Sequence, residues 1–434
     1  MNPRLVLAGS VTGAVIVALD GTVLTIAQPT LQEDLGASLG QVQWTSTGYL
    51  VAVASLLVFA GRLGDRYGHR RLFGVGMLGF GATSAGIGLA PGVDWVIGLR
   101  VVQGVFGALL QPATLGMLRS AYPPDRLRGP IALRTAAIGV SAAVGPLVGG
   151  VLVAGSGWRA VFFLNVVPAL VLGALALAVR EPERVGRVPL DLPGAVLLAV
   201  TLGFLVDALA STRWAGLAVA AVTGAAFVRH ERRAASPLIP RAVPGAPLGV
   251  LLAASAALSG TLFVGTFVLQ HTLGLDPFQS ALRCLPLAVL MVAAAALCPV
   301  LLRRAGTRRT TATAMTVLAA GILVLSQASG TLALGTGFAL LGAGFGTVMV
   351  AATHAVVRQS PLEAAGVAGG LQQTTMNVGP TLGVAVVTPL MGQAAALTVL
   401  ALVALTGAVL ATRFHVVTAG QGQPGDRPAV PARR

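Results

Sequence analysis

The stretch Gly61-Arg62-Leu63-Gly64-Asp65-Arg66-Tyr67-Gly68-His69-Arg70-Arg71 is dense in charge and lies between two segments, 44–60 and 72–90, that have almost none. An apolar run of about 20 residues is long enough to cross the hydrocarbon core of a bilayer as a helix. The pattern therefore predicts two membrane helices joined by a short charged loop with glycines for a tight turn.

The same alternation of apolar runs and charged connections continues along the whole chain. Its 434 residues are 55% hydrophobic and only 10% charged, with a mean hydropathy of +0.84. A soluble domain carries about 25% charged residues, so an ordinary soluble enzyme and a disordered scaffold are both excluded. Cutting the runs at arginine clusters, Pro and Gly predicts an all-α polytopic membrane protein with fourteen transmembrane helices, near 5–27, 44–60, 72–90, 95–118, 131–154, 160–179, 191–210, 214–228, 247–270, 280–301, 310–327, 332–354, 364–389 and 394–412.

The net charge of +15 comes entirely from arginine, because the chain contains no Lys. With the amino terminus inside, 24 of the 29 arginines fall in inner segments, and the exceptions are Arg100, Arg134, Arg159, Arg213 and Arg283. This is the positive-inside bias, and it predicts that both termini are cytoplasmic. Charge dispersed over short loops forms no single basic stripe, so nucleic acid is not an expected partner.

Two motifs recur at nearly one spacing. The Gly61–Arg71 stretch returns at 299–309, offset by 238 residues, with Arg303 in place of Asp65. Gly145-Pro146-x-x-Gly149 returns as Gly379-Pro380-x-x-Gly383, offset by 234. A duplicated bundle is a transporter architecture. It predicts an N-terminal six-helix bundle (1–179), two inserted helices with linkers (180–246), a C-terminal six-helix bundle (247–412) and a disordered cytoplasmic tail (413–434).

Four stretches resemble the fourteen-helix drug:proton antiporters of the major facilitator superfamily: Leu19–Val23 with Ala27–Pro29, Gly61–Arg71, Leu99–Gly107 and Gly145–Gly150. The resemblance runs from about residue 5 to 412. It implies a major facilitator fold and export by alternating access of the two bundles. One departure is Gln28, which stands where the family usually has Leu and places a polar group near the outer mouth, where it bears on substrate choice.

Asp20 is the only acid deep in the first half. At 1.5 Å per residue it lies about 22 Å from the inner face, and Arg100 lies about 7.5 Å from the outer face of a core about 30 Å thick. Both groups are therefore expected at one depth. An acid inside the membrane is a functional hypothesis by default: Asp20 takes up the proton, and Arg100 tunes and senses it. A static pair that only orders the bundle is the alternative.

Amides gather on two helices. Arg100, Gln103, Gly107 and Gln111 share one face of the fourth helix, while Gln373 and Asn377 share one face of the thirteenth. Such groups must point inward in hydrocarbon. We expect Gln28, Gln103, Gln111, Gln373 and Asn377 to contact substrate, with plain hydrogen bonding between helices as the alternative.

The charged stretch between helices 2 and 3 is expected to act as a conformational latch. Asp65 would pair with Arg66, Arg70 or a neighbouring helix terminus in one state and release it in the other; the residues assigned are Gly61, Asp65, Arg66, Gly68, Arg70 and Arg71. The second-half copy lacks the acid and should latch weakly. Charge that only sets topology is the alternative.

Gly145, Pro146, Gly149 and Gly150 on the fifth helix allow a neighbour to approach closely and favour a bend. The resemblance implies that this motif marks antiporters, whereas a plain packing motif is the alternative. His354 is interpreted as a helix-end residue that could alternatively shuttle protons. The sequence has no Cys/His metal cluster, so no metal site is expected, and Cys284 and Cys298 are interpreted as small apolar fillers.

Together these features predict a proton-coupled antiporter that exports small amphipathic or hydrophobic compounds such as a drug, an antibiotic or a natural product. The alternative is a proton symporter or uniporter for a small nutrient or metabolite. No enzyme activity and no cofactor are expected, because the proton gradient drives transport and the loops offer no catalytic cluster. Arg without Lys, with abundant Ala, Gly, Val and Pro, is typical of a GC-rich bacterium. We therefore expect the bacterial plasma membrane as the location. A monomer is expected as the oligomeric state.

Overall fold

The computed structural model describes residues 3–123, 126, 128–178, 191–211, 214–234, 237, 245–328, 330–359, 365–393 and 395–414, and this part of the chain is helical with no strand. Each of the fourteen predicted spans overlies a helix, and the all-α fold class is confirmed. The elements are α1 (Pro3–Leu35), α2 (Leu39–Tyr67), α3 (His69–Gly88), α4 (Val93–Ala121), α5 (Arg128–Ser156), α6 (Arg159–Ala178), α7 (Leu192–Ser211), α8 (Trp214–Arg233), α9 (Gly245–Phe267), η1 (Val268–Thr272), α10 (Pro277–Ser326), α11 (Thr331–Gln359), α12 (Ala365–Val387), η3 (Thr388–Leu390) and α13 (Ala395–Ala411).

The charged stretch is not the loop that the sequence predicts. α2 continues through it to Tyr67, and α3 begins at His69, so Gly68 alone leaves the helix. Its φ of 95° lies where L side chains are strained, which is why glycine stands there. The prediction was wrong because charged residues end an apolar run without ending a helix.

The second copy of the stretch has the same geometry. α10 contains two predicted helices, 280–301 and 310–327, which turn into each other at Gly306 with a φ of 75°. Gly68 and Gly306 are 238 residues apart, the offset of the sequence repeat. Both halves therefore reverse direction at one glycine.

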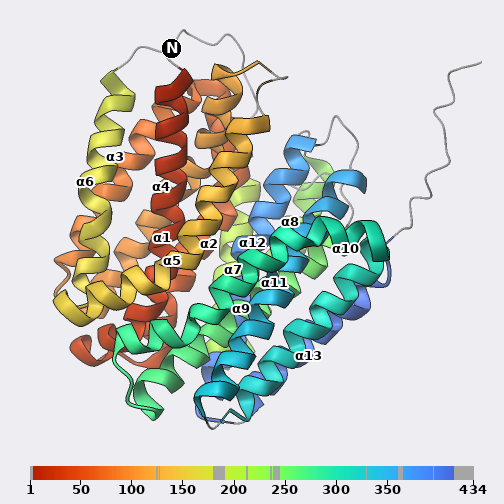
Figure 1. Ribbon diagram of the computed structural model, residues 1–434. Helices are drawn as coiled ribbons and strands as arrows, with labels where there is room; N and C mark the ends of the chain where they lie inside the picture. Colours follow the sequence, from red (N-terminus) through yellow and green to blue (C-terminus); the bar gives the residue numbers. More distant parts are fainter. Residues whose placement is uncertain are drawn as a thin grey trace, which may run out of the picture.

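The helices fall into two groups that pack mainly within themselves. In the first half, α1 packs on α4, α5 and α6, and α3 packs on α4 and α6; in the second, α9 packs on α11, α12 and α13. Figure 1 shows the first group in red to yellow beside the second in green to blue. The predicted domain borders near 180 and 246 fall at residues outside or beside the described ranges, and so does the tail from 415.

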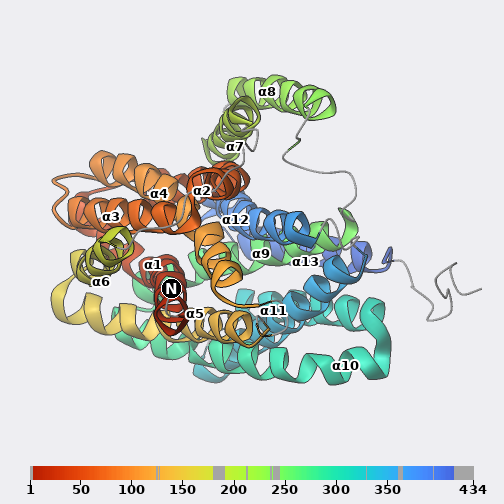
Figure 2. The same cartoon turned by 90° about the horizontal axis from the view of Figure 1, so that it is seen from above.

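The inserted helices form a pair at the edge of the molecule. α7 packs against α2 and α12, whereas α8 packs mainly on α7 and lies outermost (Figure 2). Arg62 near the end of α2 donates through Nη2 to the carbonyl oxygen of Pro237 at 3.0 Å, in the segment that follows α8. α7 therefore covers the side of the bundle where α2 of the first half meets α12 of the second, opposite the contact between α5 and α10 (Figure 2).

Nine helices of the described part are long and apolar enough to cross a membrane by length and composition. The merged α10 is one of these nine, although it contains two of the predicted spans. α3, α8 and α12 carry more polar or charged residues, and α13 is shorter. This pattern of long apolar helices identifies a multi-pass membrane protein.

The two halves meet toward one end of the bundle. We call the end at which α1 begins the inner end and the opposite one the outer end, following the predicted topology. Near the outer end, Gln270 donates through Nε2 to the carbonyl oxygen of Ile26 at 3.0 Å, and His271 Nδ1 lies 3.4 Å from Glu33 Oε1. Gly150 of α5 packs against the backbone of Phe278 at the start of α10. These contacts close the outer end of the interface.

Candidate functional site

Asp20 of α1 and Arg100 of α4 form an ion pair inside the first half. Arg100 Nη1 donates to Asp20 Oδ2 at 2.6 Å, and the two residues are 1% and 2% exposed. The depths estimated from helix rise therefore agree with the structure in bringing these two groups together. A buried charge pair is costly to desolvate and is retained only with further hydrogen bonds around it.

Arg100 has those further partners. Its Nε donates to the carbonyl oxygen of Thr45 at 2.8 Å, and Nη1 also donates to Gln103 Oε1 at 2.5 Å. The guanidinium carbon lies 4.5 Å from the ring centroid of Tyr49 and 5.8 Å from that of Phe162, which adds cation–π attraction. Neutral acceptors and aromatic faces therefore surround the cation independently of Asp20.

The network extends to two more helices. Asn165 of α6 donates through Nδ2 to Asp20 Oδ1 at 2.8 Å, so both carboxylate oxygens accept a hydrogen bond. Gln103 donates through Nε2 to the hydroxyl of Ser84 in α3 at 2.7 Å. The sequence-based prediction missed Asn165. The available signal was an amide in the otherwise apolar segment 161–178.

The Tyr49 hydroxyl is buried without a hydrogen-bond partner in the described part of the chain. Tyr49 stacks on the guanidinium of Arg100, so its hydroxyl lies beside the ion pair. A buried polar group without a partner destabilises the conformation in which it occurs. It is free to form a hydrogen bond when the conformation changes.

The glycines of α5 place that helix against both halves. A Cβ at Gly145 would overlap Thr22, and one at Gly149 would press on Val23, both in α1. A Cβ at Gly150 would overlap the backbone of Pro277 and Phe278 in α10. A small cavity of ≈ 60 Å³ beside Pro146 is lined by residues of α1, α5, α9 and α10, none of them charged.

The repeated motif does the same in the second half. A Cβ at Gly379 would overlap Ser255, and one at Gly383 would overlap the backbone of Ala256, both in α9. α5 therefore approaches α1 as α12 approaches α9. The sequence repeat is a repeat of close helix packing.

The five amides expected at a substrate site lie apart. Gln28 donates to the Ser46 hydroxyl at 2.9 Å, and Gln103 belongs to the Arg100 network. Asn377 donates to the carbonyl oxygen of Gln373 in its own helix at 2.9 Å, and the Gln373 side chain is exposed. Gln111 is half-buried, and its Oε1 has no hydrogen-bond partner among the described residues.

The expected latch residues form a compact group at the inner end of α2 and α3. His69 Nε2 lies 3.1 Å from Asp65 Oδ1, across Gly68. Its ring fills the space between Gly64 of α2 and Gly116 of α4, where a Cβ on either glycine would overlap it. Arg70 is 6% exposed, and Arg66 lies over the Tyr67 ring at 5.1 Å. The sequence-based prediction did not assign His69 as the neighbour of Asp65.

In the described ranges, no group of three or more His, Cys, Asp or Glu side chains is placed to hold a metal ion. The charged groups that the first half buries most deeply are Asp20 and Arg100, each at most 2% exposed. The chemistry available there is proton transfer and charge pairing.

Comparisons with known proteins match this architecture. The model of the Major Facilitator Superfamily matches residues 11–384. The chain is 42% identical over 401 residues to a tetracenomycin C resistance and export protein of Streptomyces glaucescens, covering 87% of this chain and 74% of the relative. It is 36% identical over 410 residues to the cephamycin export protein CmcT of Amycolatopsis lactamdurans, covering 88% and 83%.

A solved structure shows the same fold at low sequence identity. It is a crystal structure of the peptide transporter POT in complex with sulfate, 16% identical, with a TM-score of 0.68 over 93% of each chain. The glycine-centred repeat, the two helix groups and the family match lead to one conclusion: this chain belongs to the Major Facilitator Superfamily.

Proposed function

We propose that this protein exports a small amphipathic or hydrophobic compound, such as an antibiotic or other natural product, in exchange for protons. The observation that carries the proposal is the buried Asp20–Arg100 pair, with a network of neutral groups around it from three further helices, α2, α3 and α6. The export and resistance relatives support the export direction and the substrate class. The protein would act as a monomer in the bacterial plasma membrane, with both termini in the cytoplasm and no cofactor.

The geometry supports a role in proton coupling, because protonation neutralises Asp20 while Arg100 keeps its positive charge. Protonation of Asp20 removes the attraction for Arg100 but leaves the cation its bonds to Thr45 and Gln103. A change of partners then costs less than breaking an isolated buried pair, which is about 3–5 kcal/mol. One proton moving through 100 mV supplies about 2.3 kcal/mol, enough for roughly a 50-fold gradient.

The substrate class is proposed from what lines the interface. The small cavity beside Pro146 offers apolar side chains and the hydroxyls of Thr22, Thr25 and Thr266. Gln111 and Gln373 would supply further hydrogen bonds once the halves rearrange. Such a surface suits a neutral or monocationic compound better than a dication, which would need a carboxylate.

Alternating access would open the outer end that the structure closes. We expect a cleavable cross-link between Cys residues at Glu33 and His271, whose side chains lie 3.4 Å apart across the two halves, to reduce export at least tenfold. Reduction of the cross-link should restore export. The matched control places Cys at Asp34 and Arg159, which pair within the first half and move together. Equal loss in both pairs would contradict a rocking motion at this contact.

The Asp65 group would favour the state in which the inner ends of α2 and α3 are held together. Asp65→Asn is expected to lower turnover several-fold while leaving KM unchanged, because it removes the charge that faces His69 without touching a substrate site. Arg304→Gln, in the second-half copy that lacks the acid, is the control. An unchanged turnover for Asp65→Asn would assign this group to topology alone.

The experiment that tests the proposed function uses inverted vesicles and a panel that includes aromatic polyketides, β-lactams and simple organic cations. Substrate-dependent proton movement is measured with a pH-sensitive dye. Uptake of a compound with no accompanying proton movement would contradict antiport.

A further inference from the structure

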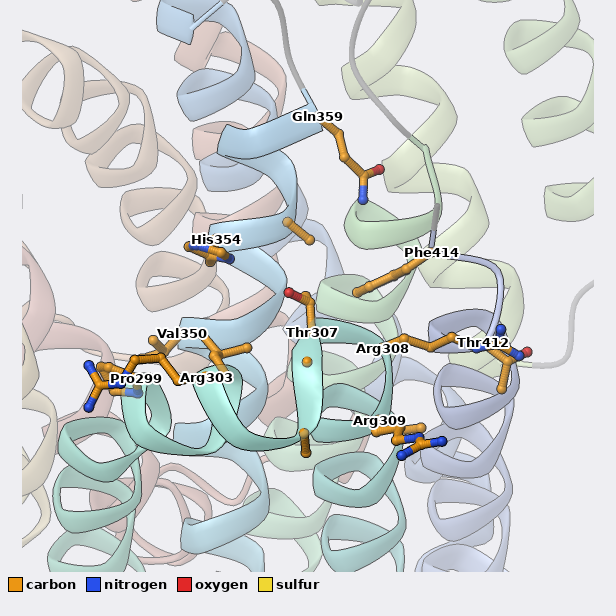
Figure 3. A pocket seen from close by; sticks show the side chains of 15 residues that line it. Pro299, Arg303, Thr307, Arg308, Arg309, Val350, His354, Gln359, Thr412 and Phe414 are labelled. Atoms are coloured by element: carbon orange, nitrogen blue, oxygen red, sulfur yellow. The ribbon is translucent and has the colours of Figure 1, made fainter. Parts of the chain in front are cut away.

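A large cavity lies in the second half, where α10 turns at Gly306. Its volume is ≈ 1070 Å³, and it is bounded by α10, the inner end of α11 and the residues after α13. Figure 3 shows Thr307 and Gln359 facing it from opposite ends. The cavity is separate from the Asp20 network and from the interface between the halves.

The charged side chains that line this cavity are all basic. They are Arg303, Arg308 and Arg309, with His354 and no acid among the described residues that line it. Arg303 and His354 lie on one side of Thr307, and Arg308 and Arg309 on the other (Figure 3). His354 Nδ1 is buried and has no hydrogen-bond partner among the residues that the structure describes. That nitrogen is closed off from the cavity, whereas Arg303, Arg308 and Arg309 are exposed, so their positive charges are available to an anion that enters it.

Comparison with the first half shows how the charge has changed at this end of the repeat. There the His69 ring fills the slot between Gly64 and Gly116, and Asp65 supplies a negative charge. At the offset of 238, His69 becomes Thr307 and Gly116 becomes His354. Asp65 becomes Arg303 at the same offset. Gly64 becomes Leu302, so Leu302 and His354 stand where the first half has the two glycines that flank the His69 ring. The second half therefore lacks the acid of the first half and has a cation in its place.

We propose that this cavity binds a phosphate-bearing anion. The planar guanidinium of arginine matches phosphate oxygens in paired hydrogen bonds. Basic pockets between helices at the cytoplasmic side bind anionic lipid headgroups, and this cavity lies at the inner end. A membrane phosphodiester and free phosphate share this chemistry. The inference does not depend on the proposed export function, because binding is measured without transport.

Native mass spectrometry of the purified full chain in detergent tests the site. We expect the protein to retain phosphatidylglycerol at least tenfold more strongly than zwitterionic phosphatidylcholine. The double variant Arg308→Gln/Arg309→Gln should lose this preference. Arg232→Gln/Arg233→Gln, which removes two exposed arginines at the end of α8, should keep it. If both double variants lose the lipid preference equally, the preference comes from diffuse surface charge and the proposed site is wrong.

A second measurement distinguishes the source of the phosphate. Inorganic phosphate is added to delipidated protein, and the melting temperature is compared with that in chloride at equal ionic strength. Stabilisation that Arg308→Gln/Arg309→Gln abolishes, without lipid preference, assigns the cavity to free phosphate. Lipid preference without stabilisation assigns it to a headgroup. His354→Gln should weaken whichever ligand binds. If the wild type binds neither the lipid headgroup nor free phosphate, the proposal is overturned.

Discussion

Asp20→Asn is expected to abolish uphill export, lowering the accumulated gradient from about 50-fold to none. The substitution keeps the shape of the side chain and removes the only acid in the Arg100 network. Arg100 would then stay bound to Thr45 and Gln103 in every state, so no proton could change its partners. Downhill movement of substrate should persist at a reduced rate.

Companion variants separate coupling from folding. Removing one partner of a buried pair leaves an uncompensated charge, so Arg100→Gln should destabilise the protein by about 3–5 kcal/mol. Asp20→Asn/Arg100→Gln replaces the pair by two neutral amides and should melt above Arg100→Gln alone. It should still fail to couple. Proton-dependent export by this stable double variant would assign the pair to structure.

Gly383→Ala is expected to give the second-largest loss, through packing. A Cβ at this position would overlap the backbone of Ala256 in α9, which no side-chain rotation can relieve. Overpacking of this kind costs about 1–3 kcal/mol and forces the helices apart. We expect a lower melting temperature and at least a tenfold loss of transport, measured on protein that remains monodisperse.

Gly139→Ala is the matched control, because a Cβ there meets no atom within 4 Å. Alanine also favours the helix over glycine by about 1 kcal/mol, so this variant should be neutral or more stable. Gly145→Ala tests the first half, where the obstacle is the Thr22 side chain. If Gly383→Ala behaves like Gly139→Ala, the approach of α12 to α9 is looser than this structure has it.

The sequence predicted the site contact that depends on depth along a helix, and it missed the contacts that depend on which helices pack together. Helix rise alone placed Asp20 and Arg100 at one depth, because depth is linear in residue number along a straight helix. Asn165 was not found, since nothing in the spacing of α6 relates it to α1. The same limit applies to Tyr49, whose ring stacks on Arg100 from another helix.

The sequence repeat predicted the overall fold well, but it predicted the structure at the inner ends of the helices less well. Gly68 and Gly306 could be matched by offset, and both have positive φ. The helical continuation to Tyr67 was missed, because hydropathy reports the membrane boundary and not the end of the hydrogen-bonded helix. The cavity beside Thr307 could not be predicted, since it depends on how α10, the inner end of α11 and the residues after α13 pack against one another.

Proton coupling is tested directly by counting protons in proteoliposomes that contain only this protein. A pH gradient, acidic on the side that receives the substrate, is imposed with no other energy source, and substrate accumulation and proton flux are recorded together. We expect accumulation above equilibrium that collapses with the gradient and is absent in Asp20→Asn/Arg100→Gln. Equal accumulation by the wild type and this variant, or accumulation without proton flux, would contradict this expectation.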